Sequence, residues 1–136
     1  MHATYKKYIL NFKRPSGTSR GVMTEKETWF LLLEENGKIG IGECGLLRGL
    51  SVDDRPDYEE KLQWVCENIH LGKDKLWDAL LEFPSIQFGV EMAFLSLQAK
   101  SPFELFPSDF TQSKDSILIN GLVWMGEESF MKTQIE

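Results

Sequence analysis

Three glycines, Gly40, Gly42 and Gly45, satisfy the pattern G-x-G-x-x-G, in which a glycine-rich backbone can approach a dinucleotide pyrophosphate. Such a site also needs a helix that begins directly after the third glycine, because its first amides bind the phosphates. Residues 46–50, LLRGL, follow instead, and the strands before them form a hairpin pattern. We therefore expect no dinucleotide site. The alternating glycines are better interpreted as a bare strand face that another element approaches closely.

Other reactive side chains lack partners at spacings typical of a catalytic or metal site. Glu43 ends the same strand without a second acid or base at fixed spacing, which favours either a carboxylate that accepts local backbone hydrogen bonds or a surface charge. His2 and His70 have no partner at ligand spacing, so no histidine metal site is expected. Cys44 and Cys66 lie far apart among apolar or strand-like neighbours and are expected to be small buried side chains.

Two arginines lie in glycine-bearing segments, where a cation commonly orients an anionic ligand. Arg20 belongs to residues 14–27 and Arg48 to residues 44–51. We treat both as candidates for that role, with an ordinary exposed arginine as the competing interpretation.

Composition limits the class of protein. The chain has 136 residues, of which 42% are hydrophobic and 26% charged, and this is enough for one soluble core. The net charge of -6 argues against nucleic acid or an anionic membrane surface as a partner. Neither a basic-then-apolar leader nor a long apolar run occurs, so we expect a cytoplasmic protein without a membrane segment.

The first third of the chain predicts a three-stranded antiparallel meander. Residues 5–12 predict a first strand whose buried side carries Tyr8, Leu10 and Phe12. Residues 14–27, with a proline, two glycines and several hydroxyl side chains, predict a long loop.

Two further strands complete the meander. Residues 28–34 and 39–43 have strand character, and Asn36-Gly37 between them is a strong hairpin signal.

The hydrophobic period then changes to that of helices. Apolar side chains from Tyr58 to Ile69 recur at steps of four, three and four, and Ser51 with Asp54 resembles a capping box before them. Gly72 is a plausible stop. Two more helices are expected, at residues 73–82 and from Pro84 onward, the last with a buried row formed by Ile86, Val90, Ala93 and Leu97.

The last part of the chain has a different character. Residues 101–116 are expected to be a connector after a domain that spans residues 1–100. Residues 117–125, ILINGLVWM, predict a strand buried on both faces, and a partial helix is expected to follow it within residues 117–136. We therefore expect a complete small α+β domain followed by the first unit of a larger β/α repeat.

Two stretches carry a resemblance to a known family. Residues 40–51, GIGECGLLRGLS, are similar to a loop of o-succinylbenzoate synthases, and residues 84–97, PSIQFGVEMAFLSL, resemble one of their helices. Residues 119–126, INGLVWMG, match their first barrel strand, and the order of elements resembles the amino-terminal capping domain of the enolase superfamily. The sequence departs from many relatives at Leu46 and Arg48, where they carry proline.

The resemblance implies an activity for the complete enzyme, which is the dehydration of a cyclohexadiene carboxylate in menaquinone biosynthesis. It also implies two lysines and Mg²⁺ held by three carboxylates, all on barrel strands after residue 136. We therefore assign no catalytic or metal residue here, expect no cofactor bound to this chain, and expect the chain alone to be inactive.

By the same resemblance, residues 14–27 and 44–51 form a lid over the barrel mouth, with Gly40 and Gly42 as a hinge and contact surface. The candidate contacts to the small-molecule carboxylate are Arg20, Met23, Leu47 and Leu50. Trp124 and Met125, at the end of the expected barrel strand, are either pocket-lining or packing residues.

Alternative functions stay open at this stage. The chain could be the cap of another superfamily member, such as a dipeptide epimerase or a muconate cycloisomerase. It could also be a non-enzymatic interaction module. In either case an unpaired apolar segment at residues 117–125 is expected to promote self-association or to bind the missing barrel.

Overall fold

A computed structural model describes residues 1–18 and 21–135 of the chain. It divides into two compact units. The first unit contains Met1–Tyr8 and Glu27–Pro107, and the second contains Ile9–Lys26 and Ser108–Glu136.

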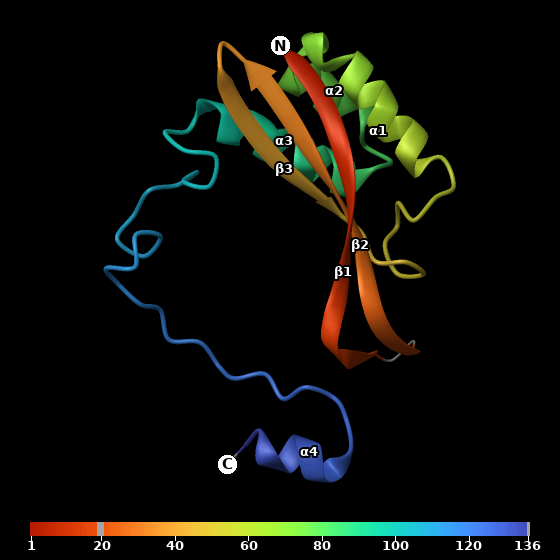
Figure 1. Ribbon diagram of the computed structural model, residues 1–136, viewed down its shortest axis with the longest axis vertical. Helices are drawn as coiled ribbons and strands as arrows, with labels where there is room; N and C mark the ends of the chain where they lie inside the picture. Colours follow the sequence, from red (N-terminus) through yellow and green to blue (C-terminus); the bar gives the residue numbers. More distant parts are fainter. Residues whose placement is uncertain (19–20, 136) are drawn as a thin grey trace. The chain divides into compact units, whose positions relative to one another are not determined.

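One sheet contains all the strands in the described residues. Its strands are β1 (His2–Thr18), β2 (Gly21–Glu35) and β3 (Lys38–Gly45), in the order β1-β2-β3 (Figure 1). β2 and β3 pair antiparallel through a two-residue turn at Asn36 and Gly37, whose φ angles of 52° and 76° suit the tight hairpin that this dipeptide favours. The predicted meander and its hairpin turn are confirmed.

The predicted long loop at residues 14–27 is wrong. β1 extends to Thr18 and β2 begins at Gly21, so most of this segment is a strand pair. Neighbouring strands satisfy each other's backbone groups whatever their side chains are, so a composition of glycine, serine and threonine hid the pairing.

The predicted buried face of the first strand is also wrong. Tyr8 and Leu10 are 50% and 39% exposed, whereas Ala3 is buried and Tyr5 packs partly against the core. Because side chains alternate along a strand, the odd-numbered residues at the start of β1 point to the core and Tyr8 points away. Tyr8 instead lies near Phe30, with ring centroids 6.2 Å apart.

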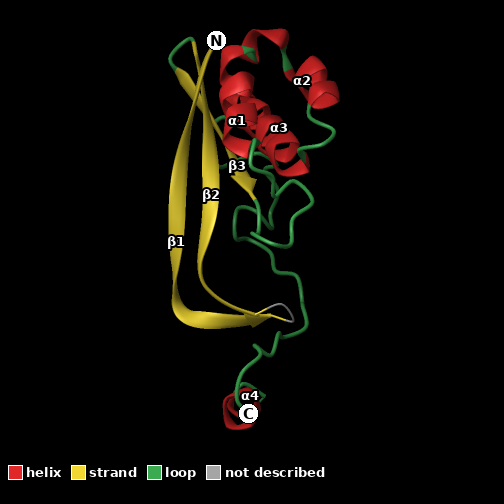
Figure 2. Cartoon of the chain, turned by 90° about the vertical axis from the view of Figure 1, so that its right-hand side faces the viewer, coloured by secondary structure: helices red, strands yellow, loops and turns green. Residues whose placement is uncertain are grey.

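Helices cover one face of the sheet in the first unit (Figure 2). They are α1 (Tyr58–Glu67), the 3-10 turn η1 (Ile69–Leu71), α2 (Lys73–Ala79) and α3 (Pro84–Gln98). The three predicted helices are confirmed, although α2 ends three residues earlier than expected. Gly72, with φ 81°, ends η1 and not the first helix as predicted, since α1 already ends at Glu67.

The predicted capping box before α1 is wrong. The residue that precedes the helix is Asp57, whose side chain makes no capping hydrogen bond. Ser51 accepts a hydrogen bond from the Leu47 N–H at 2.8 Å, and Asp54 accepts one from the Gly49 N–H at 2.6 Å. Both side chains stabilise the loop before the helix and not the helix itself.

The core lies between the sheet and the helices. Each of its side chains is less than a tenth exposed to solvent. The predicted row of α3 belongs to it in full. The buried apolar residues are Ala3, Trp29, Leu31, Leu33, Cys44, Leu46, Tyr58, Leu62, Val65, Ile69, Leu76, Leu80, Phe83, Ile86, Val90, Ala93, Phe94 and Leu97.

Glycines let α3 lie directly on β3. A Cβ atom on Gly42 would overlap the Gly89 carbonyl oxygen and lie 2.8 Å from the Ala93 nitrogen, and one on Gly40 would lie 2.8 Å from the Leu97 nitrogen. No side chain fits these positions, so backbone packs on backbone. The predicted close contact is confirmed. The expected hinge against a neighbouring domain is wrong, because the partner is α3 of the same unit.

The second unit contains the remaining helix, α4 (Glu128–Thr133). The predicted strand at residues 117–125 is wrong, since the structure assigns no strand to these described residues and Leu118 is 99% exposed. A buried strand requires neighbouring strands, and the described sheet contains only β1, β2 and β3. Residues 101–116 contain neither helix nor strand, and the domain boundaries at residues 100 and 116 stay predictions.

We predict that Gly42→Ala lowers the free energy of unfolding by about 1–3 kcal/mol, because the added methyl group forces α3 away from β3. Urea denaturation of the chain measures this change. Gly121→Ala is the matched control, since nothing lies within 4 Å of a Cβ atom there. Equal unfolding midpoints for the two variants would contradict the glycine contact.

Candidate functional site

The loop of residues 46–57, here called the β3–α1 loop, contains two of the four predicted lid residues. Leu47 and Leu50 lie in one turn, in which the Leu50 N–H donates to the Leu47 carbonyl at 3.1 Å. The Ser51 N–H donates to the same carbonyl at 2.9 Å. Leu47 is half-buried and Leu50 is 54% exposed, so the turn presents Leu50 to the outside.

Arg48 fixes this turn through charged partners. Its Nε atom lies 2.6 Å from the Glu27 carboxylate of β2, and its Nη1 atom lies 2.7 Å from the Asp54 carboxylate. The guanidinium carbon also lies 5.5 Å from the centre of the Trp29 ring. Arg48 is therefore paired with two carboxylates of the chain, and its role in orienting an anionic ligand stays a prediction.

The charged groups around Arg48 stabilise each other's ionised forms. A hydrogen bond from Lys7, and secondly one from Arg48, hold the pKa of Glu27 below its ordinary value. The Gly49 N–H, followed by Arg48, does the same for the pKa of Asp54. The charged network thus joins β1, β2 and the β3–α1 loop.

A buried carboxylate that the sequence did not single out holds the other end of the loop. Asp53 is 1% exposed and accepts hydrogen bonds from the backbone N–H of Ser85 at 2.8 Å and from its hydroxyl at 2.6 Å. Its neighbour Val52 is 82% exposed. No local sequence signal could have found this contact, because the two partners are 32 residues apart.

The structure confirms Cys44 as a buried side chain and Glu43 as an exposed carboxylate. Glu43 accepts a hydrogen bond from the Thr28 hydroxyl at 2.8 Å. Cys44 is a buried free thiol, and burial raises its pKa far above the ordinary value. Cys66 is a free thiol that is only half-buried, and burial raises its pKa to about 11. Neither thiol is prepared for nucleophilic chemistry.

Met23 lies in the second unit. It lines an apolar hollow together with residues 11–16 and with Trp124, Met125, Phe130 and Gln134. The Gln134 side chain holds this wall in place, since it accepts a hydrogen bond from the Trp124 N–H and donates one to the Trp124 carbonyl. Arg20, the fourth predicted lid residue, lies outside the described residues. A lid role shared by these four residues therefore stays a prediction.

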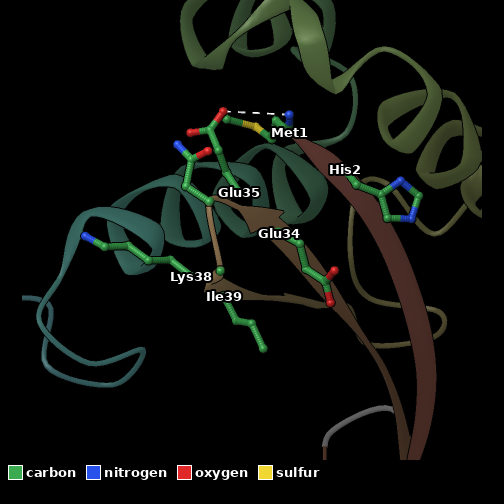
Figure 3. A pocket seen from close by; sticks show the side chains of 8 residues that line it. Met1, His2, Glu34, Glu35, Lys38 and Ile39 are labelled. Carbon is green, nitrogen blue, oxygen red and sulfur yellow. Dashed lines mark ion pairs between the residues drawn. The ribbon is translucent and has the colours of Figure 1, made fainter.

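Another hollow lies at the β2–β3 turn (Figure 3). The ammonium group of Met1 lies 3.7 Å from the Glu35 carboxylate there, while the side chains of His2 and Lys38 point away from each other.

In the described part of the chain, no cluster of three histidine, cysteine, aspartate or glutamate side chains could hold a metal ion. Nor is any helix among the described residues long and apolar enough to cross a membrane.

A three-stranded meander with helices on one face and a structured β3–α1 loop defines an enolase-type capping domain, and comparison with known proteins agrees. The family model described as "MenC, N-terminal domain" matches residues 2–97, so the chain belongs to this family. The predicted α+β capping-domain fold and the family are confirmed.

The similar curated proteins are o-succinylbenzoate synthases. The one from Desulfotalea psychrophila is 35% identical, over 100% of this chain and 45% of its own length. A second, from Vibrio cholerae, is 31% identical over 74% of this chain and 30% of its own length. The chain thus spans less than half the length of these relatives.

Solved structures share the fold. MenC from Desulfotalea psychrophila has a TM-score of 0.74 at 29% identity, over 99% of this chain and 45% of its own. The o-succinylbenzoate synthase from Thermosynechococcus elongatus, complexed with Mg in the active site, has a TM-score of 0.61 at 20% identity, over 79% of this chain and 32% of its own. An enolase family member from Agrobacterium tumefaciens with homology to dipeptide epimerases has a TM-score of 0.68 at 13% identity, over 98% of this chain and 41% of its own. The last two comparisons show the fold alone.

We predict that Arg48→Met destabilises the chain at neutral pH and that this difference from the original chain disappears in acid. The folded-state pKa values of Glu27 and Asp54 lie below their ordinary values, so their stabilisation is present above about pH 4 and is lost as pH falls through the lowered values. Urea unfolding midpoints of the original chain and of Arg48→Met, compared between pH 7 and pH 2, measure this difference in stability. Lys75→Met, at an exposed position of α2, is the control for loss of a positive charge. A difference that does not vary with pH would contradict the charged network.

Proposed function

We propose that this chain is the capping portion of an o-succinylbenzoate synthase-like enzyme. The observation that carries the proposal is the family match over residues 2–97, together with 35% identity to one such enzyme across the whole chain. The complete enzyme would be a carbon–oxygen lyase that dehydrates a cyclohexadiene carboxylate in menaquinone biosynthesis, in the cytoplasm. The likeness to the dipeptide epimerase homologue supports only the shared fold, so it does not favour a second activity.

In this proposal the β3–α1 loop is part of the lid. A lid excludes water from the reacting groups and contacts the parts of the substrate that do not react. Leu50 and Val52, 54% and 82% exposed, are apolar groups on a loop whose backbone is already ordered by its own hydrogen bonds. They suit the hydrocarbon ring of a cyclic carboxylate. Met23 of β2 stays a further lid candidate, as does Arg20, which lies outside the described residues.

The chemical step would belong to the barrel, which is the proposed partner of this cap. Mg²⁺ bound there would act as a Lewis acid that stabilises negative charge on the substrate carboxylate. The Thermosynechococcus elongatus enzyme, complexed with Mg in its active site, supports this choice of metal for a relative. In this proposal the part of the present chain is to cover that site. The exposed apolar residues 117–125 are proposed to pair with barrel strands or, without them, to cause self-association.

A chimera tests the proposal. We expect residues 1–97 to restore o-succinylbenzoate synthase activity when they replace the corresponding domain of the Desulfotalea psychrophila enzyme. Leu50→Glu in the chimera should lower kcat/KM by about tenfold or more, because a charge replaces an apolar substrate contact.

The matched control is Leu81→Glu, which changes a leucine that is 69% exposed between α2 and α3 and should leave activity unchanged. A second control is the Desulfotalea psychrophila enzyme with its own domain rejoined at the same two positions. It shows whether the junctions themselves affect activity. A folded chimera without activity, beside an active rejoined control, would contradict the proposed function.

A further inference from the structure

Asp53 is a buried carboxylate whose hydrogen-bonding partners belong to a distant helix. A buried aspartate is unfavourable unless hydrogen bonds replace its lost water. Ser85 provides two of them, from the backbone N–H at 2.8 Å and from the hydroxyl at 2.6 Å. The contact therefore favours one position of the loop, the one in which the carboxylate meets Ser85.

The helix also benefits from this contact. α3 begins at Pro84, and the residue before it, Phe83, has an apolar side chain that makes no capping hydrogen bond. Asp53 accepts the backbone N–H of the second helical residue and places a carboxylate at the positive end of the helix dipole. The cap of α3 thus comes from the β3–α1 loop and not from the helix's own sequence.

Tyr58 extends the contact to α1. The hydroxyl of Ser85 has one proton, which it donates to Asp53, so the Tyr58 hydroxyl is the donor in its 2.6 Å contact with the Ser85 oxygen. Burial raises the pKa of Tyr58, so its hydroxyl stays protonated and available as a donor. The Tyr58 hydroxyl thus donates to Ser85, and the Ser85 hydroxyl donates to Asp53. These two hydrogen bonds join α1, α3 and the loop.

The segment between Cys44 and Asp53, which contains the exposed part of the β3–α1 loop, is fixed at both ends on α3. Before the loop, Cys44 of β3 packs so closely on α3 that a Cβ atom on Gly89 would overlap its sulfur. After the turn, Asp53 is bound to Ser85 of α3. Leu50 and Val52 lie between these two points and are the exposed apolar side chains of the loop's described residues.

We propose that Asp53 is a positioning residue that holds the β3–α1 loop in its substrate-covering conformation before any substrate binds. The proposal rests on the lid function proposed above. A loop fixed in advance loses little conformational entropy when it covers a substrate, which favours tight binding. Asp53 touches neither substrate nor metal in this account, and it acts by placing Leu50 and Val52.

Amide hydrogen exchange of the chain tests the anchor without any enzyme assay. We expect Asp53→Ala to speed exchange of the Leu50 and Ser51 amides by about tenfold or more, while central α3 amides such as those of Val90 and Ala93 stay protected. Asp53→Asn should retain part of the protection, because its side-chain oxygen can still accept the Ser85 N–H. Asp74→Ala, at an exposed position of α2, is the matched control.

Two results in this experiment would overturn the proposal. One is unchanged exchange at Leu50 and Ser51 in the Asp53→Ala chain. The other is an equal loss of protection at all amides, which would make Asp53 a general stability residue. Ser85→Ala, which removes one hydrogen bond and leaves the carboxylate, is a milder variant for use if Asp53→Ala does not fold.

Kinetics of the chimera then test the role in catalysis. We expect Asp53→Ala and Ser85→Ala to raise KM by about tenfold with little change in kcat, since substrate binding must now order the loop. A KM that does not change although the loop amides exchange faster would overturn the positioning role. Inactivity of the unsubstituted chimera would instead count against the proposed function and would leave the exchange result on the anchor intact.

Discussion

The backbone contact between β3 and α3 is the constraint on which the rest of the first unit depends. Gly40 and Gly42 on the strand and Gly89 on the helix leave no room for a Cβ atom, so the helix lies as near the sheet as its backbone allows. That placement lets Ser96 accept a hydrogen bond from the Ile41 N–H at 2.9 Å and brings the first turn of α3 to Asp53. The pattern that resembled a phosphate-binding loop serves packing, and through packing it sets where the β3–α1 loop begins and ends.

Two kinds of interaction hold that loop, and they differ in strength. The Arg48 side chain is 49% exposed, so water and salt weaken its pairs with Glu27 and Asp54. Asp53 is 1% exposed, so loss of its contact with Ser85 would leave a buried polar group unsatisfied. The buried contact therefore determines the loop's position on α3, and the exposed network restricts the turn that Leu47 and Leu50 share. A loop with this construction is held at its base and carries exposed apolar side chains at its surface.

Local signals predicted the parts of the fold that local sequence controls. The Asn36-Gly37 turn requires positive φ at both residues, and the buried row of α3 repeats with the helical period, so both were visible in the sequence. Features that depend on partners far away in the sequence could not be predicted in this way. Residues 14–18 and 21–27 became strands through pairing with each other. Residues 117–125 found no strand neighbour, and Asp53 and Arg48 bind groups 32 and 21 residues away. Two of the predicted lid residues, Leu47 and Leu50, share one turn of the described β3–α1 loop.

The reactivity of Cys44 tests the contact of α3 with β3 most directly, because the thiol lies against Gly89 and is covered as long as the helix stays in place. Alkylation of the native chain at mildly alkaline pH, followed across a urea series, measures how often the contact opens. The account predicts that Cys66, which is half-buried, reacts first, and that Cys44 reacts only as fast as the whole unit unfolds. Alkylation of Cys44 without urea, at the rate of an exposed thiol, would contradict it.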